Sequence, residues 1–276
     1  MSAPPLVDVV SLFPGLNQNL AALLRSLRPD DWMRSTVCRE WSVKDIAAHI
    51  LDGQLRRLAF GRDAYIPAGP SVTQLEETVR LINRLNADWV RAAQRLSPRV
   101  LIDHLEWAGP QLAEYFQSLD PYRPATFPVA WAGESSSANW FDIARDYTEQ
   151  WHHQQQIRDA VHAPPLTARK WLNPVLATFV RCLPHAYRET MAAEGAAVQF
   201  EVTGDAGDCW CLRRQNSVWN LTVGPAPDPN AGITLDSAAA WRLFTRGLTP
   251  SEARRAATLT GDQALAAVAL HATAVM

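Results

Sequence analysis

The spacing of hydrophobic residues predicts that the first part of the chain is helical. Leucines recur at helical intervals over residues 16–27, ahead of Pro29, which places them on one face of a helix. Ser42, with Asp45 three positions later, is typical of a helix N-terminus, because each side chain can accept a hydrogen bond from the other residue's backbone N–H. Further helices are expected over residues 42–60, 72–96, 98–118 and 139–161, with an interruption near Gly109-Pro110.

The second part of the chain has a different pattern. A helix is expected over residues 167–192, divided or kinked at Pro174 and Pro184. Beyond Gly195, apolar and polar residues alternate, which is the period of a β-strand with one buried face. Strands are expected over residues 198–202, 209–212, 218–223, 233–235 and 257–259, and helices over residues 237–246 and 262–275.

Two segments with loop composition separate these regions. Residues 121–139 are rich in proline, glycine and serine, and Ala163-Pro164-Pro165 ends the last helix of the first part. We therefore expect a mainly α chain of two domains. These are a helical bundle over residues 1–163 and a small α+β domain over residues 167–276.

Composition and charge narrow the classes of function. Of the 276 residues, 47% are hydrophobic and 20% are charged, which is ordinary for a folded globular protein. The formal net charge of −2 and the scattered basic residues argue against nucleic acid or an anionic membrane as a partner. No apolar stretch approaches the ~20 residues of a membrane span, and the first residues lack the pattern of a signal peptide. We therefore expect a cytoplasmic protein.

The cysteines give little indication of function. They are Cys38, Cys182, Cys209 and Cys211. In a reducing compartment, scattered cysteines are more often buried thiols than disulfides. Cys209 and Cys211 share a face of an expected strand, but a C-x-C pair without a companion pair is a weak indication of zinc. We interpret both as buried thiols.

Glu149 and His153 are the strongest candidates for chemistry. They are separated by one helical turn in the helix expected over residues 139–161, so both side chains fall on the same face. A carboxylate and an imidazole placed in this way can bind one cation, and another helix of the bundle can supply a third ligand. His49 is the candidate for that ligand. Three protein ligands leave a fourth position of a zinc ion open, which is the arrangement of a catalytic site.

Other interpretations of these residues are open at this stage. His152 can replace His153 as a ligand, and Asp146 can join or replace Glu149. The polar stripe that carries Glu149 and His153 is also typical of a solvated helix face. His49 lies between isoleucines, as a hydrogen-bonded core histidine does. Short patterns of this kind also match by chance.

Four segments resemble the mycothiol-dependent maleylpyruvate isomerase family of the DinB-like superfamily. Residues 41–49 (WSVKDIAAH) are similar to the second-helix signature of that superfamily. Residues 148–160 (TEQWHHQQQIRDA) match the family's E-x-W-x-H-Q-Q-D-I-R segment. Residues 202–205 (VTGD) and 240–250 (AWRLFTRGLTP) are similar to its C-terminal domain. The resemblance spans nearly the whole chain, in the expected order.

This resemblance implies a DinB-like four-helix bundle followed by an α+β domain similar to sterol-carrier-like folds. It also implies a zinc site, because the family's two histidines and one glutamate carry over to His49, Glu149 and His153. One departure is Gln156, which stands where the family usually has an aspartate. If that position supports a ligand by a hydrogen bond, a glutamine there alters the ligand's orientation or the local charge.

The resemblance further implies mycothiol, a low-molecular-weight sugar thiol, as cosubstrate. A metal ion deprotonates a thiol that binds it, and the thiolate is the nucleophile. We therefore expect a thiol S-transferase or a maleylpyruvate-type cis–trans isomerase that acts on a small electrophile. Zinc is the expected metal, although histidine and glutamate ligands also suit other divalent first-row ions.

Four arginines are candidates for binding the carboxylate of an acidic substrate. Arg80 and Arg84 lie one turn apart in the first domain, and Arg242 and Arg246 have the same spacing in the second. For each arginine taken individually, the pattern favours an ordinary surface position. The alternative function is a non-catalytic protein that uses the same bundle to bind a small ligand or to regulate a partner.

Overall fold

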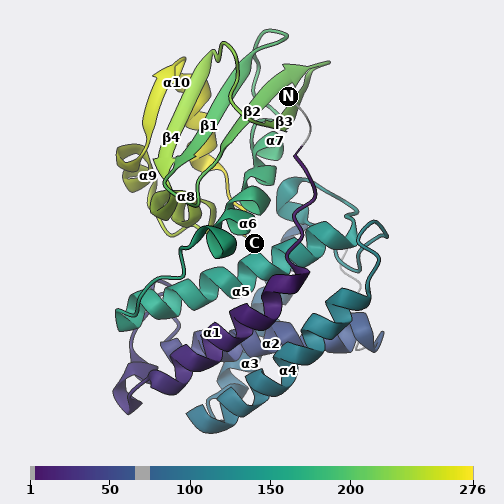
Figure 1. Cartoon of the computed structure of the whole chain (residues 1–276), viewed down its shortest axis with the longest axis vertical. Coiled ribbons are helices and arrows are strands. Elements are labelled where there is room, and N and C mark those ends of the chain that lie inside the picture. Colours follow the sequence, from purple (N-terminus) through teal and green to yellow (C-terminus); the bar gives the residue numbers. More distant parts are fainter. Residues whose placement is uncertain (1–3, 66–74, 276) are drawn as a thin grey trace. The chain divides into compact units, whose positions relative to one another are not determined.

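The computed structural model describes residues 4–65 and 75–275. Its first part is helical, as the hydrophobic spacing predicts (Figure 1). The helices are α1 (Phe13–Ser26), α2 (Val43–Arg57), α3 (Leu75–Ala93), α4 (Pro98–Ser118) and α5 (Asn139–Val161). The expected start of α3 at residues 72–74 lies outside the described residues.

Helix α2 begins where the sequence predicts it. The Ser42 hydroxyl accepts a hydrogen bond from the backbone N–H of Asp45, and the Asp45 carboxylate accepts one from the backbone N–H of Ser42 (3.0 Å). Two N–H groups that lack partners within the helix are thereby satisfied. At its other end α2 continues into a π-helical turn, Leu58–Arg62.

Helix α4 corrects one expectation, because it is continuous through Gly109 and Pro110. Pro110 lies on the exposed side of α4, where water can bond the carbonyl that loses its helical partner. Gly109 lies on the buried side, where a Cβ atom would be 2.6 Å from Nδ2 of Asn17 in α1. The glycine therefore allows α1 and α4 to approach closely.

Helix α5 is buried on several sides in spite of its polar sequence. Its buried polar residues are Asn139, Asp142, Thr148, Gln150, His152, His153, Gln154, Gln155, Gln156 and Arg158. Buried polar groups are tolerated when they are hydrogen-bonded. For example, Gln154 donates to the Leu16 carbonyl (3.2 Å), and Gln155 accepts from the Leu166 N–H (2.9 Å). The interpretation of this polar stripe as a solvated face is therefore wrong.

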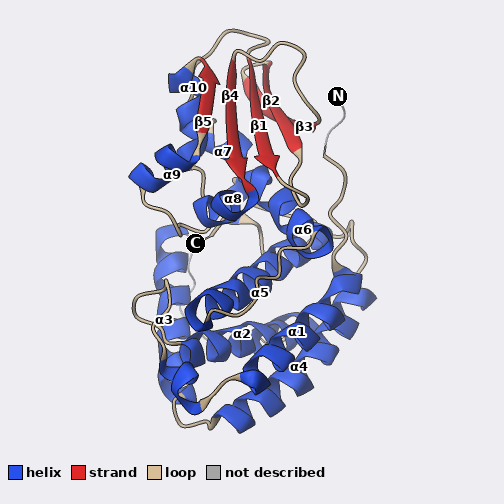
Figure 2. Cartoon of the chain, turned by 60° about the vertical axis from the view of Figure 1, so that its left-hand side comes forward, coloured by secondary structure: helices blue, strands red, loops and turns tan. Residues whose placement is uncertain are grey.

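The second part of the chain combines a sheet with short helices (Figure 2). The helices are α6 (Arg169–Phe179), α7 (Leu183–Ala186), α8 (Ser237–Phe244), α9 (Pro250–Ala256) and α10 (Gln263–Ala267). The strands are β1 (Ala197–Thr203), β2 (Cys209–Gln215), β3 (Val218–Val223), β4 (Ala231–Asp236) and β5 (Thr258–Gly261). The mainly α fold, with a helical bundle followed by a small α+β part, is confirmed.

The strand order is β3-β2-β1-β4-β5, with β1 and β4 parallel and the other pairs antiparallel. Val198, Phe200 and Val202 are buried on one face, and Phe200 packs against Phe244 of α8 with ring centroids 5.7 Å apart. The alternating residues Gln199 and Glu201 are half-buried on the other face. The alternation read from the sequence therefore identified the core face of β1.

Three helical expectations in this part need correction. The helix expected over residues 167–192 is divided, as its prolines predict, into α6 and the short α7, but its helical structure ends at Ala186. Pro174 is accommodated inside α6, whereas Pro184 lies at the start of α7, where its missing N–H is not needed. The closing helix stops at Ala267, ahead of a 3-10 turn. Helix α9 was not expected, although Thr249 and Glu252 form a capping box at its start.

The described chain forms two compact units. One comprises Val9–Thr126 and Glu149–Leu166; the other comprises Phe127–Thr148 and Thr167–Met276, together with the segment up to Asp8. The chain thus changes unit inside α5 as well as at Leu166. The domain limits 1–163 and 167–276 stay a prediction.

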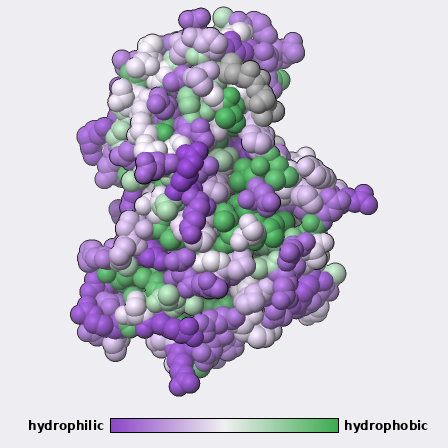
Figure 3. Space-filling model, in the orientation of Figure 1, coloured by the Kyte–Doolittle hydropathy of each residue, from purple (hydrophilic) through white to green (hydrophobic). Residues whose placement is uncertain are grey.

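No helix of the described residues is both long and apolar enough to cross a membrane. Hydrophilic residues are spread over the face of the molecule in Figure 3, with apolar patches between them. Large apolar side chains are exposed at several positions, including Trp107, Tyr122 and Met191. Exposed apolar residues of this kind are normal on protein surfaces.

Candidate metal centre

The structure brings His49, Glu149 and His153 together inside one compact unit. Each residue offers one ligand atom, and these atoms lie within 4.8 Å of one another. Nε2 of His153 is 3.5 Å from Oε2 of Glu149, and the rings of His49 and His153 meet edge to face with centroids 4.7 Å apart. Two imidazoles and one carboxylate at this separation are the donor set that divalent zinc takes in catalytic sites.

Helix α2 holds His49 in a fixed position. The capped start at Ser42 sets the register of the helix, and the Trp89 indole N–H donates to the Ala48 carbonyl (2.8 Å). This bond ties α3 to α2 beside His49. Glu149 and His153 are positioned relative to each other by α5 alone, because one turn of this helix places both side chains on the same face.

His49 is not a hydrogen-bonded core histidine. Its Nδ1 atom is buried and has no hydrogen-bond partner among the described residues. Burial, together with the neighbouring His153, holds the pKa of His49 well below its usual range. The ring is therefore neutral at physiological pH, which is the form of histidine that binds metals.

Gln156 supports His153 from the next turn of α5. Its carboxamide oxygen Oε1 lies 2.8 Å from Nδ1 of His153. A carbonyl oxygen can only accept, so this orientation of the carboxamide requires the proton on Nδ1 and leaves a lone pair on Nε2, on the side of Glu149. The thiol of Cys38 donates to the same oxygen, with Sγ 3.5 Å from Oε1.

The ring of Trp41 lies next to the rings of His49 and His153. Its ring centroid is 4.8 Å from that of His49 and 6.4 Å from that of His153. It lies in a turn closed by a hydrogen bond from its backbone N–H to the Cys38 carbonyl (2.7 Å). The turn thus places Trp41 beside His49 and His153, and Cys38 beside Gln156.

Asp52 and Arg56 follow His49 along α2. Asp52 is buried beside Arg56, with Oδ2 3.0 Å from a guanidinium nitrogen, and Arg56 also donates to the Asn86 side chain (2.8 Å). Burial raises the pKa of Asp52 to about 6, against the opposing effect of Arg56. The charge of Arg56 also contributes to the low pKa of His49.

The alternative ligands do not join the group. His152 is buried, and its ring is tilted against that of His153 with centroids 4.0 Å apart, but it is not among the residues whose ligand atoms converge in the described part of the chain. Asp146 belongs to the other compact unit, where it lies 3.5 Å from Arg145. The spacing alone left these residues open, and the converging atoms favour Glu149 and His153.

The four candidate arginines are divided between the two compact units. Arg80 and Arg84 are exposed on α3. Arg242 and Arg246 lie in the other compact unit, where Arg242 stacks over the Trp241 ring at 4.4 Å and Arg246 is exposed. Their role in substrate binding stays a prediction.

Residue type and spacing did not single out Arg56, Trp41 or Cys38, because only the fold places them near His49 or His153.

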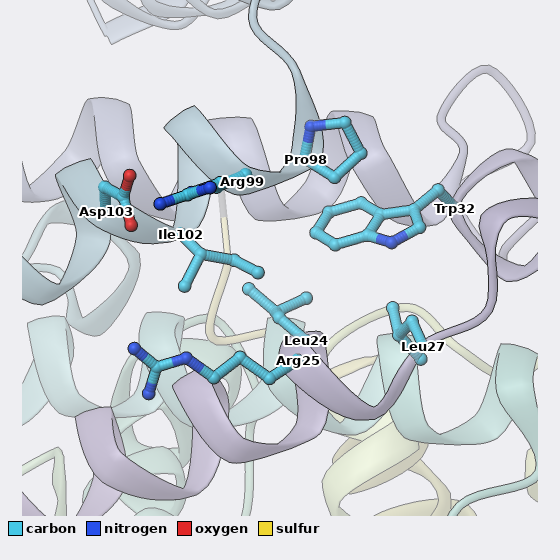
Figure 4. Close-up of a pocket in the computed structure, with 8 residues that line it drawn as sticks. All are labelled: Leu24, Arg25, Leu27, Trp32, Pro98, Arg99, Ile102 and Asp103. Carbon is cyan, nitrogen blue, oxygen red and sulfur yellow. The ribbon is translucent and has the colours of Figure 1, made fainter.

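A separate pocket of about 380 Å³ opens between the end of α1 and the start of α4 (Figure 4). Its lining residues are Leu24, Arg25, Leu27, Trp32, Pro98, Arg99, Ile102 and Asp103. None of them belongs to the His49 group, and Arg25 is paired with Glu106 at 2.6 Å.

Comparison with known proteins decides the family. Residues 14–158, more than half of the chain, match the family described as "Mycothiol maleylpyruvate isomerase N-terminal domain". The chain belongs to this family. His49, Glu149 and His153 all lie within the matched residues of this family member, as do Gln156, Trp41 and Cys38.

Two solved structures share the fold. One is a mycothiol-dependent maleylpyruvate isomerase, with 11% sequence identity, a TM-score of 0.52, and coverage of 88% of this chain and 91% of that chain. The other is a variant of such an isomerase with a histidine replaced by alanine, with 12% identity, a TM-score of 0.53, and coverage of 94% and 96%. No curated protein sequence matches this chain closely. At such low identity the structural likeness is evidence of a common fold.

Proposed function

We propose that this family member is a metal-dependent enzyme that uses a low-molecular-weight thiol, mycothiol, to attack a small electrophile. The observation that carries the proposal is the convergence of His49, Glu149 and His153, with ligand atoms within 4.8 Å of one another. Membership in a family named for a mycothiol-dependent isomerase supports the choice of thiol.

The residues fit a zinc ion. Two neutral imidazoles and one carboxylate would leave the bound ion a net positive charge and an open position. A zinc ion there would lower the pKa of a thiol that reaches that position. Other divalent first-row ions suit the same donors, and the metal is proposed here as zinc on the chemistry of the ligands.

The protein's own residues prepare the site. Gln156 keeps the proton of His153 on Nδ1, so that Nε2 is available as a ligand. Burial keeps His49 neutral. The Trp41 ring packs beside the imidazole of His49 and lies 6.4 Å from that of His153. These contacts fix the ligands before any thiol arrives, which reduces the cost of reorganisation during the reaction.

Two reactions share the first bond-forming step. The thiolate sulfur adds to an electrophilic carbon, and the proton lost from the thiol is taken up by the product or by solvent. In a cis–trans isomerisation, the former double bond rotates as a single bond, and the C–S bond then breaks to return the thiol. In an S-transfer, the C–S bond is kept. The structural likeness to maleylpyruvate isomerases favours the first reaction as the one to test first.

The test compares thiol-dependent turnover of maleylpyruvate and of an aryl halide in separate assays. We expect conversion that requires both mycothiol and zinc, and a loss of at least about 100-fold in Glu149→Gln, because one of three ligands is weakened. Glu106→Gln, a change of the same type on α4 outside the group, serves as the control and should retain activity. If neither electrophile is converted by the zinc-loaded protein, the enzymatic proposal is wrong and the non-catalytic binding function takes its place.

A further inference from the structure

The carboxamide oxygen of Gln156 accepts two hydrogen bonds, and both bear on the metal ligand His153. One comes from Nδ1 of His153 (2.8 Å), and the other from the thiol of Cys38 (3.5 Å). Sulfur makes longer hydrogen bonds than nitrogen or oxygen, and a thiol is a weak donor. Cys38 therefore contacts the residue that decides which nitrogen of His153 carries the proton.

A glutamine in this place has a weakness that a carboxylate lacks. Its head group has an oxygen on one side and an NH₂ on the other, and a half-turn about the last side-chain bond exchanges them. If the NH₂ faced His153, Nδ1 would have to accept and the proton would move to Nε2. A protonated Nε2 cannot bind a metal ion.

The turned arrangement also gives the proton of His153 a nearby carboxylate in the metal-free protein. Nε2 of His153 lies 3.5 Å from Oε2 of Glu149, so an N–H at Nε2 would point to a carboxylate. The group thus has two self-consistent states, one with Nε2 open to a metal and one with Nε2 closed by its proton. An additional contact is needed to favour the open state.

We propose that Cys38 is the positioning residue that favours the open state: its S–H donates to Oε1 of Gln156 and holds that oxygen toward His153. The inference rests on the proposed function in that it takes His153 as a metal ligand. In the turned state, Cys38 would face an NH₂ group, and its own donor would lose its acceptor.

The surroundings of Cys38 fit this role. Burial raises the pKa of the Cys38 thiol, so the sulfur keeps its proton. Its turn is held by Thr36, whose hydroxyl donates to the Trp41 carbonyl (2.8 Å) and accepts from the Cys38 backbone N–H (3.2 Å). Because Trp41 of the same turn packs on His49, the thiol is anchored relative to both histidines.

The first experiment measures zinc affinity in five proteins by competition with a chromogenic chelator. Cys38→Ala should weaken zinc binding about fivefold, the loss expected for one weak buried hydrogen bond. Cys38→Ser keeps a donor and should stay within about twofold of the native protein. In Gln156→Glu, both head-group atoms are oxygens, so adding Cys38→Ala should change affinity by less than about twofold. An equal loss in both backgrounds, or no loss in the native one, would overturn the proposal.

The second experiment does not need a metal. Nitrogen-15 NMR of the imidazole of His153 in the metal-free protein, at a pH where the ring is neutral, reports which nitrogen carries the proton. We expect the Nδ1–H form to dominate in the native protein and in Cys38→Ser, and to lose population to the Nε2–H form in Cys38→Ala. Identical spectra in all three would contradict the role of Cys38. A native protein that binds no zinc would instead refute the proposed function, while the spectra still decide the role of Cys38.

Discussion

At the scale of single residues, the candidate site depends on hydrogen-bond partners that the sequence cannot show. His49, Glu149 and His153 could be named from residue type and spacing, with help from the family resemblance. The spacing left His152 open as an alternative to His153, the family resemblance favoured His153, and the converging ligand atoms agree with that choice. The support of His153 by Gln156 is a short-range contact on one helix, whereas Cys38 is distant in the sequence and reaches Gln156 only in the folded chain.

Asp52 should make stability depend on pH. Its pKa is raised by burial from 3.8 to about 6, so the folded protein binds one more proton than the unfolded chain between these values. The free energy of unfolding therefore falls as the pH rises from about 4 to about 6, and this contribution stays lost at higher pH. In Asp52→Asn this loss disappears, which we estimate as on the order of 2 kcal/mol between pH 4 and pH 7.

Urea unfolding at both pH values measures this difference. The control is Asp103→Asn, since Asp103 is an exposed aspartate on α4 in the same compact unit. It should leave the pH dependence as it is in the native protein. If stability falls between pH 4 and pH 7 in Asp52→Asn as much as in the native protein, the pKa of Asp52 is not raised by folding.

At the scale of helices and strands, the capping and alternation signals succeeded, whereas the prediction made from Pro110 was wrong. The Ser42–Asp45 pair located the start of α2, and the alternation from Val198 to Val202 identified the core face of β1. Pro110 was wrongly expected to interrupt α4, because a proline on the exposed side of a helix costs less than one in its buried side. The burial of the polar face of α5 was also not predictable, since it depends on partners from other segments.

The close approach of α1 and α4 at Gly109 can be tested by whether Gly109→Ala raises or lowers the free energy of unfolding. Glycine to alanine inside a helix normally stabilises by up to about 1 kcal/mol. At Gly109 the new Cβ would lie 2.6 Å from Nδ2 of Asn17, so we expect Gly109→Ala to destabilise the protein by about 1 to 3 kcal/mol.

Shortening the opposing side chain should remove this penalty. In an Asn17→Ala background, Gly109→Ala should become neutral or stabilising, and denaturant unfolding of the four proteins measures the coupling. If Gly109→Ala stabilises the protein in the native background, the two helices do not approach as closely as the structure indicates.

At the scale of the whole molecule, the order of a helical bundle and a small α+β part was predictable from the change in hydrophobic period alone. The strand order, in which β4 pairs in parallel with β1, was not predictable. It depends on the connection from β3 to β4, which passes β2 and β1. The compact units also divide α5 between them, a feature that no composition change marks. All three proposed ligands lie in one unit, so the metal group is complete within it.

The most direct test of this account is the metal content of the purified protein, measured by elemental analysis on the native chain and on His49→Ala and His153→Ala. The account predicts about one zinc ion per chain in the native protein, since the three residues form one site with an open position. It also predicts that both variants lose the metal while they remain folded. A native protein without metal after zinc is supplied, or a metal content that neither substitution changes, would contradict the account.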